Sequence, residues 1–180
     1  MSLAGGRSPA RDRQVIHDIN TRGWHVVQVP PRPPRHAWAF SIGLFHTFDH
    51  AEMVVFGLPA DVAATLIDAI GMRVRSGARF SDGDEDGGLM PPYRCAFRAV
   101  AEVWRPLVLG DAAWFYRERS FPAIQLFWPD RAHRLPWEHA FDPDLVEFQP
   151  LLFFPEVGPA RAAALLVAGD DPPHPSPSGA

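Results

Sequence analysis

The sequence contains no lysine, because all 17 of its basic residues are arginine. No side-chain amine is therefore available for a Schiff base, for the lysine of a phosphate-binding loop or for a lysine general base. Cysteine is almost absent as well, and Cys95 alone excludes an internal disulfide and a multi-cysteine zinc site. This cysteine content fits a reducing compartment, and we expect the protein to be cytoplasmic.

A surplus of positive charge is also lacking. The formal net charge is -4 and the isoelectric point is about 6.0, so a nucleic-acid partner is not expected. No apolar run approaches the ~20 residues of a membrane helix, and the first ten residues lack the pattern of a secretory signal. We therefore expect no membrane partner. The sequence specifies neither a cofactor nor the oligomeric state, and it leaves open whether the partner is a protein or a small molecule.

What is present is the composition of an ordinary globular domain. The chain has 180 residues, of which 47% are hydrophobic and 21% are charged, which predicts one domain with a packed core. We expect this domain to span residues 8–169. Residues 1–7 and the proline-rich residues 170–180 are expected to be disordered.

The hydrophobic pattern predicts helices and strands in an irregular order. Helices are expected at residues 9–22, 60–76, 111–119 and 159–168. Strands are expected at residues 24–29, 38–48, 53–56, 95–109 (one strand or two) and 123–128, with an irregular or short-helical segment at 135–150. The short link before residue 53 favours an antiparallel hairpin, and the acidic, glycine-rich residues 81–88 predict a mobile loop.

The succession of strands before the second helix argues against strict strand–helix alternation. We therefore predict an α+β fold, a single domain with a mainly antiparallel sheet and helices packed on one side.

Several motifs occur in a fixed order along the chain. They are Gly23-Trp24, residues 38–44 (WAFSIGL), residues 50–58 (HAEMVVFGL), residues 125–130 (QLFWPD) and Pro136-Trp137. In this combination the chain, over roughly residues 15–150, resembles an uncharacterised bacterial family, DUF4262. Ala51 departs from the family pattern, which has proline there, while His50 and Glu52 keep it. The resemblance implies no established activity.

The first candidate site is His46, His50 and Glu52, which have the spacing His-x-x-x-His-x-Glu. Two imidazoles and a carboxylate are suitable ligands for one divalent metal ion. The alternative is structural, with His50 bonded to the backbone of the turn and Glu52 capping a helix or pairing with an arginine.

The second candidate site is the segment that carries Asp130, His133, Trp137, Glu138 and His139. Carboxylates and histidines beside aromatic rings suit general acid–base catalysis. Ordinary turn chemistry at Asp130 and solvated charges are the alternative. From both sites we take His50, Glu52, Asp130 and Glu138 as the catalytic candidates.

Ligand-binding candidates are aromatic residues and arginines. An aromatic-lined pocket is predicted where residues 41–43 meet the 129–139 loop. The arginines offer planar forks for a phosphate or a carboxylate, or they lie at the surface against the acidic loop. Cys95 is expected to be a buried, inert thiol. The ligand-binding candidates are Trp38, Ser41, Trp128, Trp137, Arg94 and Arg98.

Two functions remain open at the level of sequence. The first is a non-catalytic accessory or interaction protein, which the lack of a complete catalytic motif favours. The second is a small-molecule-binding enzyme with a His and carboxylate site, with or without a metal ion, in the aromatic-lined pocket.

Overall fold

The computed structural model describes residues 8–117 and 119–155. The expected disorder at residues 1–7 and 170–180, the expected helix at 159–168 and the domain boundary at 169 lie outside the described residues. The first helix, α1 (Pro9–Arg22), confirms the sequence prediction. Ser8 Oγ accepts from the Arg11 amide at 3.3 Å, and Gly23, with a φ of 102°, ends the helix.

The centre of the molecule is a six-stranded sheet with the order β1-β2-β3-β6-β5-β4. Neighbouring strands are antiparallel except for β3 and β6, which run parallel with Glu52 opposite Ala123. The sheet is thus mixed and mostly antiparallel, and the predicted α+β class is confirmed. The strands are β1 (His25–Val29), β2 (Trp38–Ile42), β3 (Glu52–Phe56), β4 (Glu85–Met90), β5 (Tyr93–Ala99) and β6 (Ala123–Phe127).

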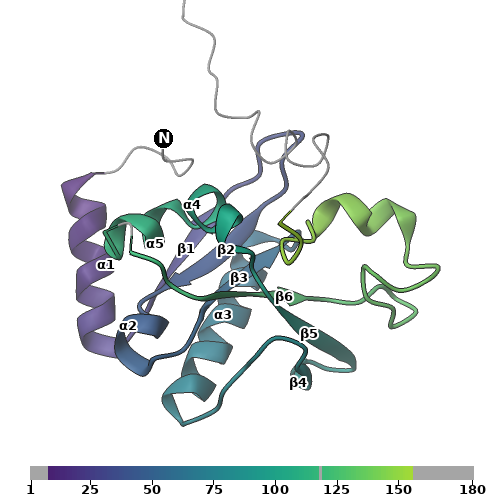
Figure 1. The fold of residues 1–180 in the computed structure, drawn as a ribbon, viewed down its shortest axis with the longest axis horizontal. Helices are drawn as coiled ribbons and strands as arrows, with labels where there is room; N and C mark the ends of the chain where they lie inside the picture. Colours follow the sequence, from purple (N-terminus) through teal and green to yellow (C-terminus); the bar gives the residue numbers. More distant parts are fainter. Residues whose placement is uncertain (1–7, 118, 156–180) are drawn as a thin grey trace, which may run out of the picture.

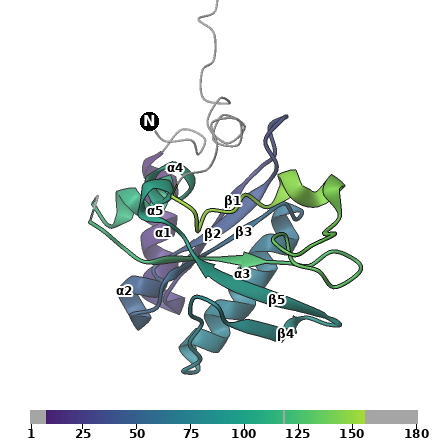
Figure 2. The ribbon, with the colours of Figure 1, turned by 45° about the vertical axis from the view of Figure 1, so that its right-hand side comes forward.

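Helices cover both faces of the sheet, so the prediction of helices packed on one side is wrong. Alternate residues of β2 enter different cores: Phe40 packs with α1, whereas Ala39 packs with the long helix α3 (Ala60–Arg75). The short helices α4 (Arg105–Val108) and α5 (Gly110–Phe115) lie on the same face as α1. Figure 1 shows α1, α4 and α5 at the left and upper left and α3 below β1, β2 and β3, and Figure 2 gives the turned view.

Three segments differ from the sequence prediction. The strand expected at residues 38–48 ends at Ile42, because Gly43 has a φ of 109° and opens the short helix α2 (Leu44–Phe48). Of the expected acidic loop at residues 81–88, residues 81–84 form a turn, whereas residues 85–88 belong to β4. The strand expected at 95–109 ends at Ala99 and is followed by the 3-10 helix η1 (Glu102–Trp104) and α4.

The acidic residues of β4 are tolerated in a strand because arginines face them. Asp86 pairs with Arg73 of α3 at 2.8 Å, and Glu85 pairs with Arg94 of β5 at 3.0 Å. The segment expected to be irregular at residues 135–150 contains a 3-10 helix, η2 (Pro143–Phe148), in agreement with the prediction of short-helical structure.

Candidate functional site

Glu52 lies at the start of β3, between β2 and β6, and its side chain is fully buried. Oε1 accepts from the backbone amides of Gly43 at 2.7 Å and Phe45 at 3.2 Å, and also from the Tyr116 hydroxyl. Oε2 accepts from the Ser41 hydroxyl. No arginine or histidine is among these partners, so the carboxyl group is held by hydrogen bonds alone.

Both hydroxyl groups that donate to Glu52 are themselves positioned by backbone amides. The Met53 amide donates to Ser41 Oγ at 2.8 Å, and the His46 amide donates to the Tyr116 hydroxyl oxygen at 3.2 Å. The oxygen of each hydroxyl therefore accepts a hydrogen bond from a backbone amide, and its O–H group donates a hydrogen bond to Glu52. The amides of Gly43 and Phe45 belong to the first turn of α2, so Glu52 also caps this helix from outside.

The environment of Glu52 changes the acidity of two groups. Burial raises the pKa of Glu52 above its ordinary value, although its four hydrogen-bond donors act in the opposite direction. Burial and the adjacent carboxyl group raise the pKa of Tyr116. Tyr116 is thus a neutral phenol, which suits its role as a donor to Glu52.

His50, two residues before Glu52 in the chain, is also buried but has separate partners. Nδ1 lies 2.7 Å from the Ala51 carbonyl oxygen, to which it donates, and Nε2 accepts from the Phe80 amide at 3.1 Å. These two bonds assign the neutral ring with its proton on Nδ1. Burial lowers the pKa of His50, and the positive charge of Arg79 acts in the same direction.

The buried neutral state of His50 predicts acid sensitivity. Because the pKa is lowered in the folded protein, the unfolded chain binds the proton first, and stability falls as the pH drops below about 6.5, the ordinary histidine value. We expect the free energy of unfolding of His50→Gln to change less over this pH range than that of the wild-type protein. Urea unfolding at several pH values between about pH 5 and pH 7.5 measures this free energy.

The matched control is His139→Gln, since His139 is exposed. This variant should keep the wild-type slope. An unchanged slope in His50→Gln would show that His50 already binds its proton equally well in the folded and unfolded states.

The structure does not bring His46, His50 and Glu52 together as metal ligands. His46 lies on α2, while His50 bonds to Ala51 and Phe80 and Glu52 faces Ser41 and Tyr116. Across residues 8–117 and 119–155, no group of three or more His, Cys, Asp or Glu side chains is placed to hold a metal ion.

Asp130 and Glu138 organise the loop that contains them. Oδ1 of Asp130 accepts from the amides of Ala132 at 2.8 Å and Arg134 at 2.9 Å, and Oδ2 accepts from Asp142 at 3.1 Å. Although burial opposes it, these donors hold the pKa of Asp130 below its usual range. Glu138 Oε2 accepts from the Leu135 amide at 2.5 Å. Asp130 thus has the turn role that the sequence left as an alternative, and Glu138 is bonded within the same loop.

The predicted ligand-binding residues do not form one pocket, although two of them meet: the Arg98 guanidinium lies over the Trp137 ring, 5.5 Å from its centroid. Trp38 donates its indole N–H to the Val108 carbonyl at 3.0 Å, and Trp128 donates to that of Phe56 at 2.8 Å, so both are used within the core. Trp137 is at the surface, where it packs against Phe127. The two arginines pair with the acidic segment, Arg94 with Glu85 and Arg98 with Asp82.

The remaining sequence candidates have equally local roles. Cys95 is buried, and burial raises the pKa of its thiol to about 11, as expected for an inert cysteine. His133 stacks near Tyr93, with ring centroids 5.0 Å apart, and His139 is exposed.

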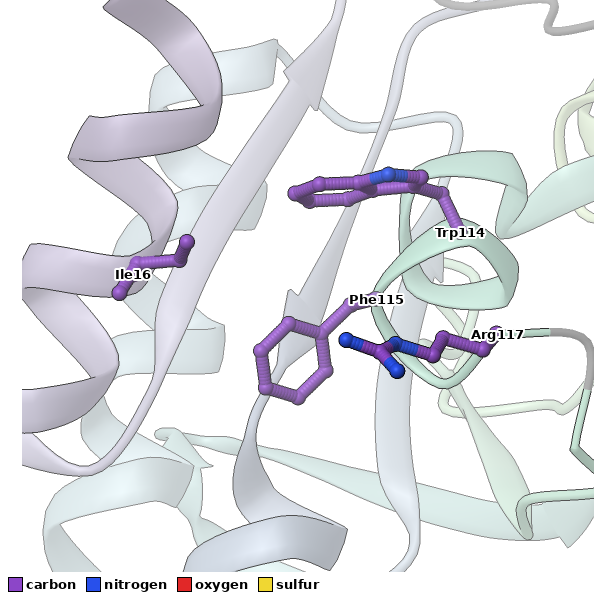
Figure 3. A pocket seen from close by; sticks show the side chains of 4 residues that line it. All are labelled: Ile16, Trp114, Phe115 and Arg117. Carbon is purple, nitrogen blue, oxygen red and sulfur yellow. The ribbon is translucent and has the colours of Figure 1, made fainter. Parts of the chain in front are cut away.

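An open cavity of about 510 Å³ lies between α1 and α5. It is lined by Ile16 of α1 and by Trp114, Phe115 and Arg117 at the end of α5. Figure 3 shows Ile16 facing the two aromatic rings and the guanidinium group across the opening. We call this cavity the α1–α5 groove. Its volume falls within the range of about 300–1,000 Å³ that is typical of small-molecule sites.

The α1–α5 groove and the Glu52 cluster are adjacent in the chain and in space. Tyr116, which donates to Glu52, stands between Phe115 and Arg117, and its ring contacts that of Phe115 at a centroid distance of 5.0 Å. An ion pair of 2.7 Å between Arg11 and Asp111 joins the same two helices. The groove walls are therefore anchored to the buried core.

Sequence reasoning missed this groove. Residues 111–119 were predicted to form a short capped helix, and nothing in their pattern indicated which side chains would face α1. The separation of Glu52 from Tyr116 by 64 positions hid the link between the two sites. The local signal is an apolar residue, Ile16, which is 47% exposed, and it resembles an ordinary surface residue.

Comparison with known proteins gives one match. The sequence model of the family described as "Domain of unknown function (DUF4262)" matches residues 18–142, which contain both the Glu52 cluster and most of the α1–α5 groove. Searches of curated proteins and of solved structures returned no match. Among the described residues, no helix has the length and apolar character needed to cross a membrane. Since the matched region is well over half of its length, the chain belongs to the DUF4262 family.

Proposed function

We propose that this chain is a non-catalytic interaction protein of the bacterial cytoplasm, and that the α1–α5 groove is its recognition surface. The observation that carries the proposal is the groove itself, which presents Ile16, Trp114 and Phe115 beside an exposed arginine. Partly exposed aromatic and aliphatic side chains around a cavity of this size are typical of binding sites.

The state of the polar candidates supports binding rather than catalysis. The side chains of Glu52 and His50 are already hydrogen-bonded, Glu52 to backbone amides and neighbouring hydroxyls and His50 to the backbone. Asp130 and Glu138 accept from amides of their own loop. Acid–base catalysis by any of these groups would first require the loss of the hydrogen bonds that it makes in the fold.

The first test uses N-phenylnaphthylamine, a neutral aromatic probe whose fluorescence rises in apolar sites. We expect saturable binding to the wild-type protein and a loss of affinity of about tenfold or more in Ile16→Asp, because a carboxylate in the groove wall must be desolvated when the probe binds. Ile16 is exposed, so the substitution should leave the fold intact.

The matched control is Met72→Asp. Met72 is an exposed apolar residue of a different helix, α3, and this variant should bind the probe as the wild-type protein does. The proposal fails if binding is not saturable, or if Ile16→Asp binds as tightly as Met72→Asp does.

A further inference from the structure

We infer that the ligand of the α1–α5 groove is an organic anion, with a flat aromatic or aliphatic body and one carboxylate or sulfonate group. This inference rests on the proposed binding function and adds the chemical class of the ligand. Two properties of the groove carry it: apolar side chains on both walls and, among the described residues that line it, one charged side chain, that of Arg117.

The apolar wall fits the body of such a molecule. Ile16 contributes an aliphatic surface from α1, and the rings of Trp114 and Phe115 stand opposite it, as Figure 3 shows. The two rings are inclined to each other by 62°, with centroids 6.5 Å apart, so they offer two differently oriented faces. Aromatic faces of this kind contribute large contact areas to binding.

The charge of Arg117 fits the anionic end. Its side chain is exposed, and in the part of the chain that the structure describes no carboxylate lies within ion-pair distance of it. Asp111, on the same helix as the groove aromatics, already pairs with Arg11. As far as the described residues go, the planar fork of the Arg117 guanidinium is therefore free to receive a carboxylate or sulfonate.

The backbone of Arg117 is positioned by its neighbours in the turn after α5. Its backbone is left-handed, with a φ of 53°, and its amide donates to the Trp114 carbonyl at 3.0 Å. The preceding residue, Tyr116, is bonded to Glu52. A cation held on an anchored turn loses less conformational freedom when a ligand binds, which favours affinity.

The test compares two probes with the same aromatic body, anilinonaphthalene sulfonate and neutral N-phenylnaphthylamine. We expect Arg117→Gln to weaken binding of the sulfonate about three- to tenfold and to leave binding of the neutral probe unchanged. Arg117→Lys, which keeps the charge, should retain part of the sulfonate affinity, and added salt should weaken only the sulfonate.

The control variant is Arg75→Gln, because Arg75 is an exposed arginine on α3, outside the groove. It should not change either affinity. If the neutral probe binds but Arg117→Gln leaves sulfonate binding intact, or Arg75→Gln weakens it equally, the anion inference is overturned and the proposed function stands. If neither probe binds saturably, the proposed function itself fails. Thermal unfolding of each variant confirms that affinities are compared between folded proteins.

Discussion

Replacement of Glu52 by alanine is expected to lower the free energy of unfolding by about 3–5 kcal/mol, because it strands several buried hydrogen-bond donors at once. The amides of Gly43 and Phe45 and the Tyr116 hydroxyl all lose their acceptor at Oε1. Ser41 loses the acceptor at Oε2. Equilibrium unfolding in urea at neutral pH measures the loss.

Glu52→Gln is expected to behave quite differently, within about 1 kcal/mol of the wild-type protein. Three of the four donors converge on Oε1, where the amide oxygen of glutamine can replace the carboxylate oxygen. The amide nitrogen then faces Ser41, whose hydroxyl oxygen can accept from it. Glu147→Ala, at an exposed carboxylate, serves as the control and should change stability little.

The pH dependence of the same variants tests the charge of Glu52. Its pKa is raised in the folded protein, so the fold keeps a proton that the unfolded chain has already lost. This contribution to stability is complete below about pH 4.5, the ordinary glutamate value, and is lost as the pH rises through the folded pKa. Glu52→Gln should lack this decline in stability with rising pH.

A loss of unfolding free energy in Glu52→Gln as large as that in Glu52→Ala would contradict the assigned hydrogen-bond pattern.

The parts of the fold that the sequence predicted well are those set by neighbours in the chain. Ser8 and Gly23 mark the ends of α1 through their own side-chain and backbone properties. The antiparallel pairing of β2 and β3 was predicted from a short link, and it is confirmed, with Trp38 opposite Phe56, although the observed link also contains α2. Local rules were sufficient in these cases.

The parts that the sequence predicted poorly depend on partners far along the chain. Residues 85–90 are too acidic for a typical strand, and they form β4 because Arg73 and Arg94 neutralise them. Glu52 was recognised as a candidate residue. Its partner Tyr116 was not, since only the folded sheet brings α5 over the start of β3.

The candidate site shows the same division. The sequence singled out His50, Glu52 and Asp130 as candidate residues, but it could not say whether their polar atoms face a ligand or the backbone. The observed distances place them against backbone amides and carbonyls. Residue type and spacing predict which groups are buried and polar, and only the geometry tells what satisfies them.

The second large effect on stability is expected at Gly43, the residue at which β2 turns into α2. Its φ of 109° is unfavourable for any L side chain, and a Cβ atom would lie 2.9 Å from the Gly23 carbonyl oxygen and 2.8 Å from Ile19 Cγ1. Gly43→Ala should therefore lower the free energy of unfolding by about 3 kcal/mol, from backbone strain and steric overlap together.

Gly77→Ala separates these two contributions. Gly77 also has a positive φ, 98°, but a Cβ atom there would meet nothing within 4 Å. It should cost only the strain, about 1–2 kcal/mol. The difference between the two variants then measures the overlap with α1. The Gly43 amide donates to Glu52 at 2.7 Å. If the backbone at Gly43 moves in Gly43→Ala to relieve the overlap, the neighbouring Phe45 amide should exchange its hydrogen faster. Equal losses in both variants would mean that α1 can move away from β2 without cost.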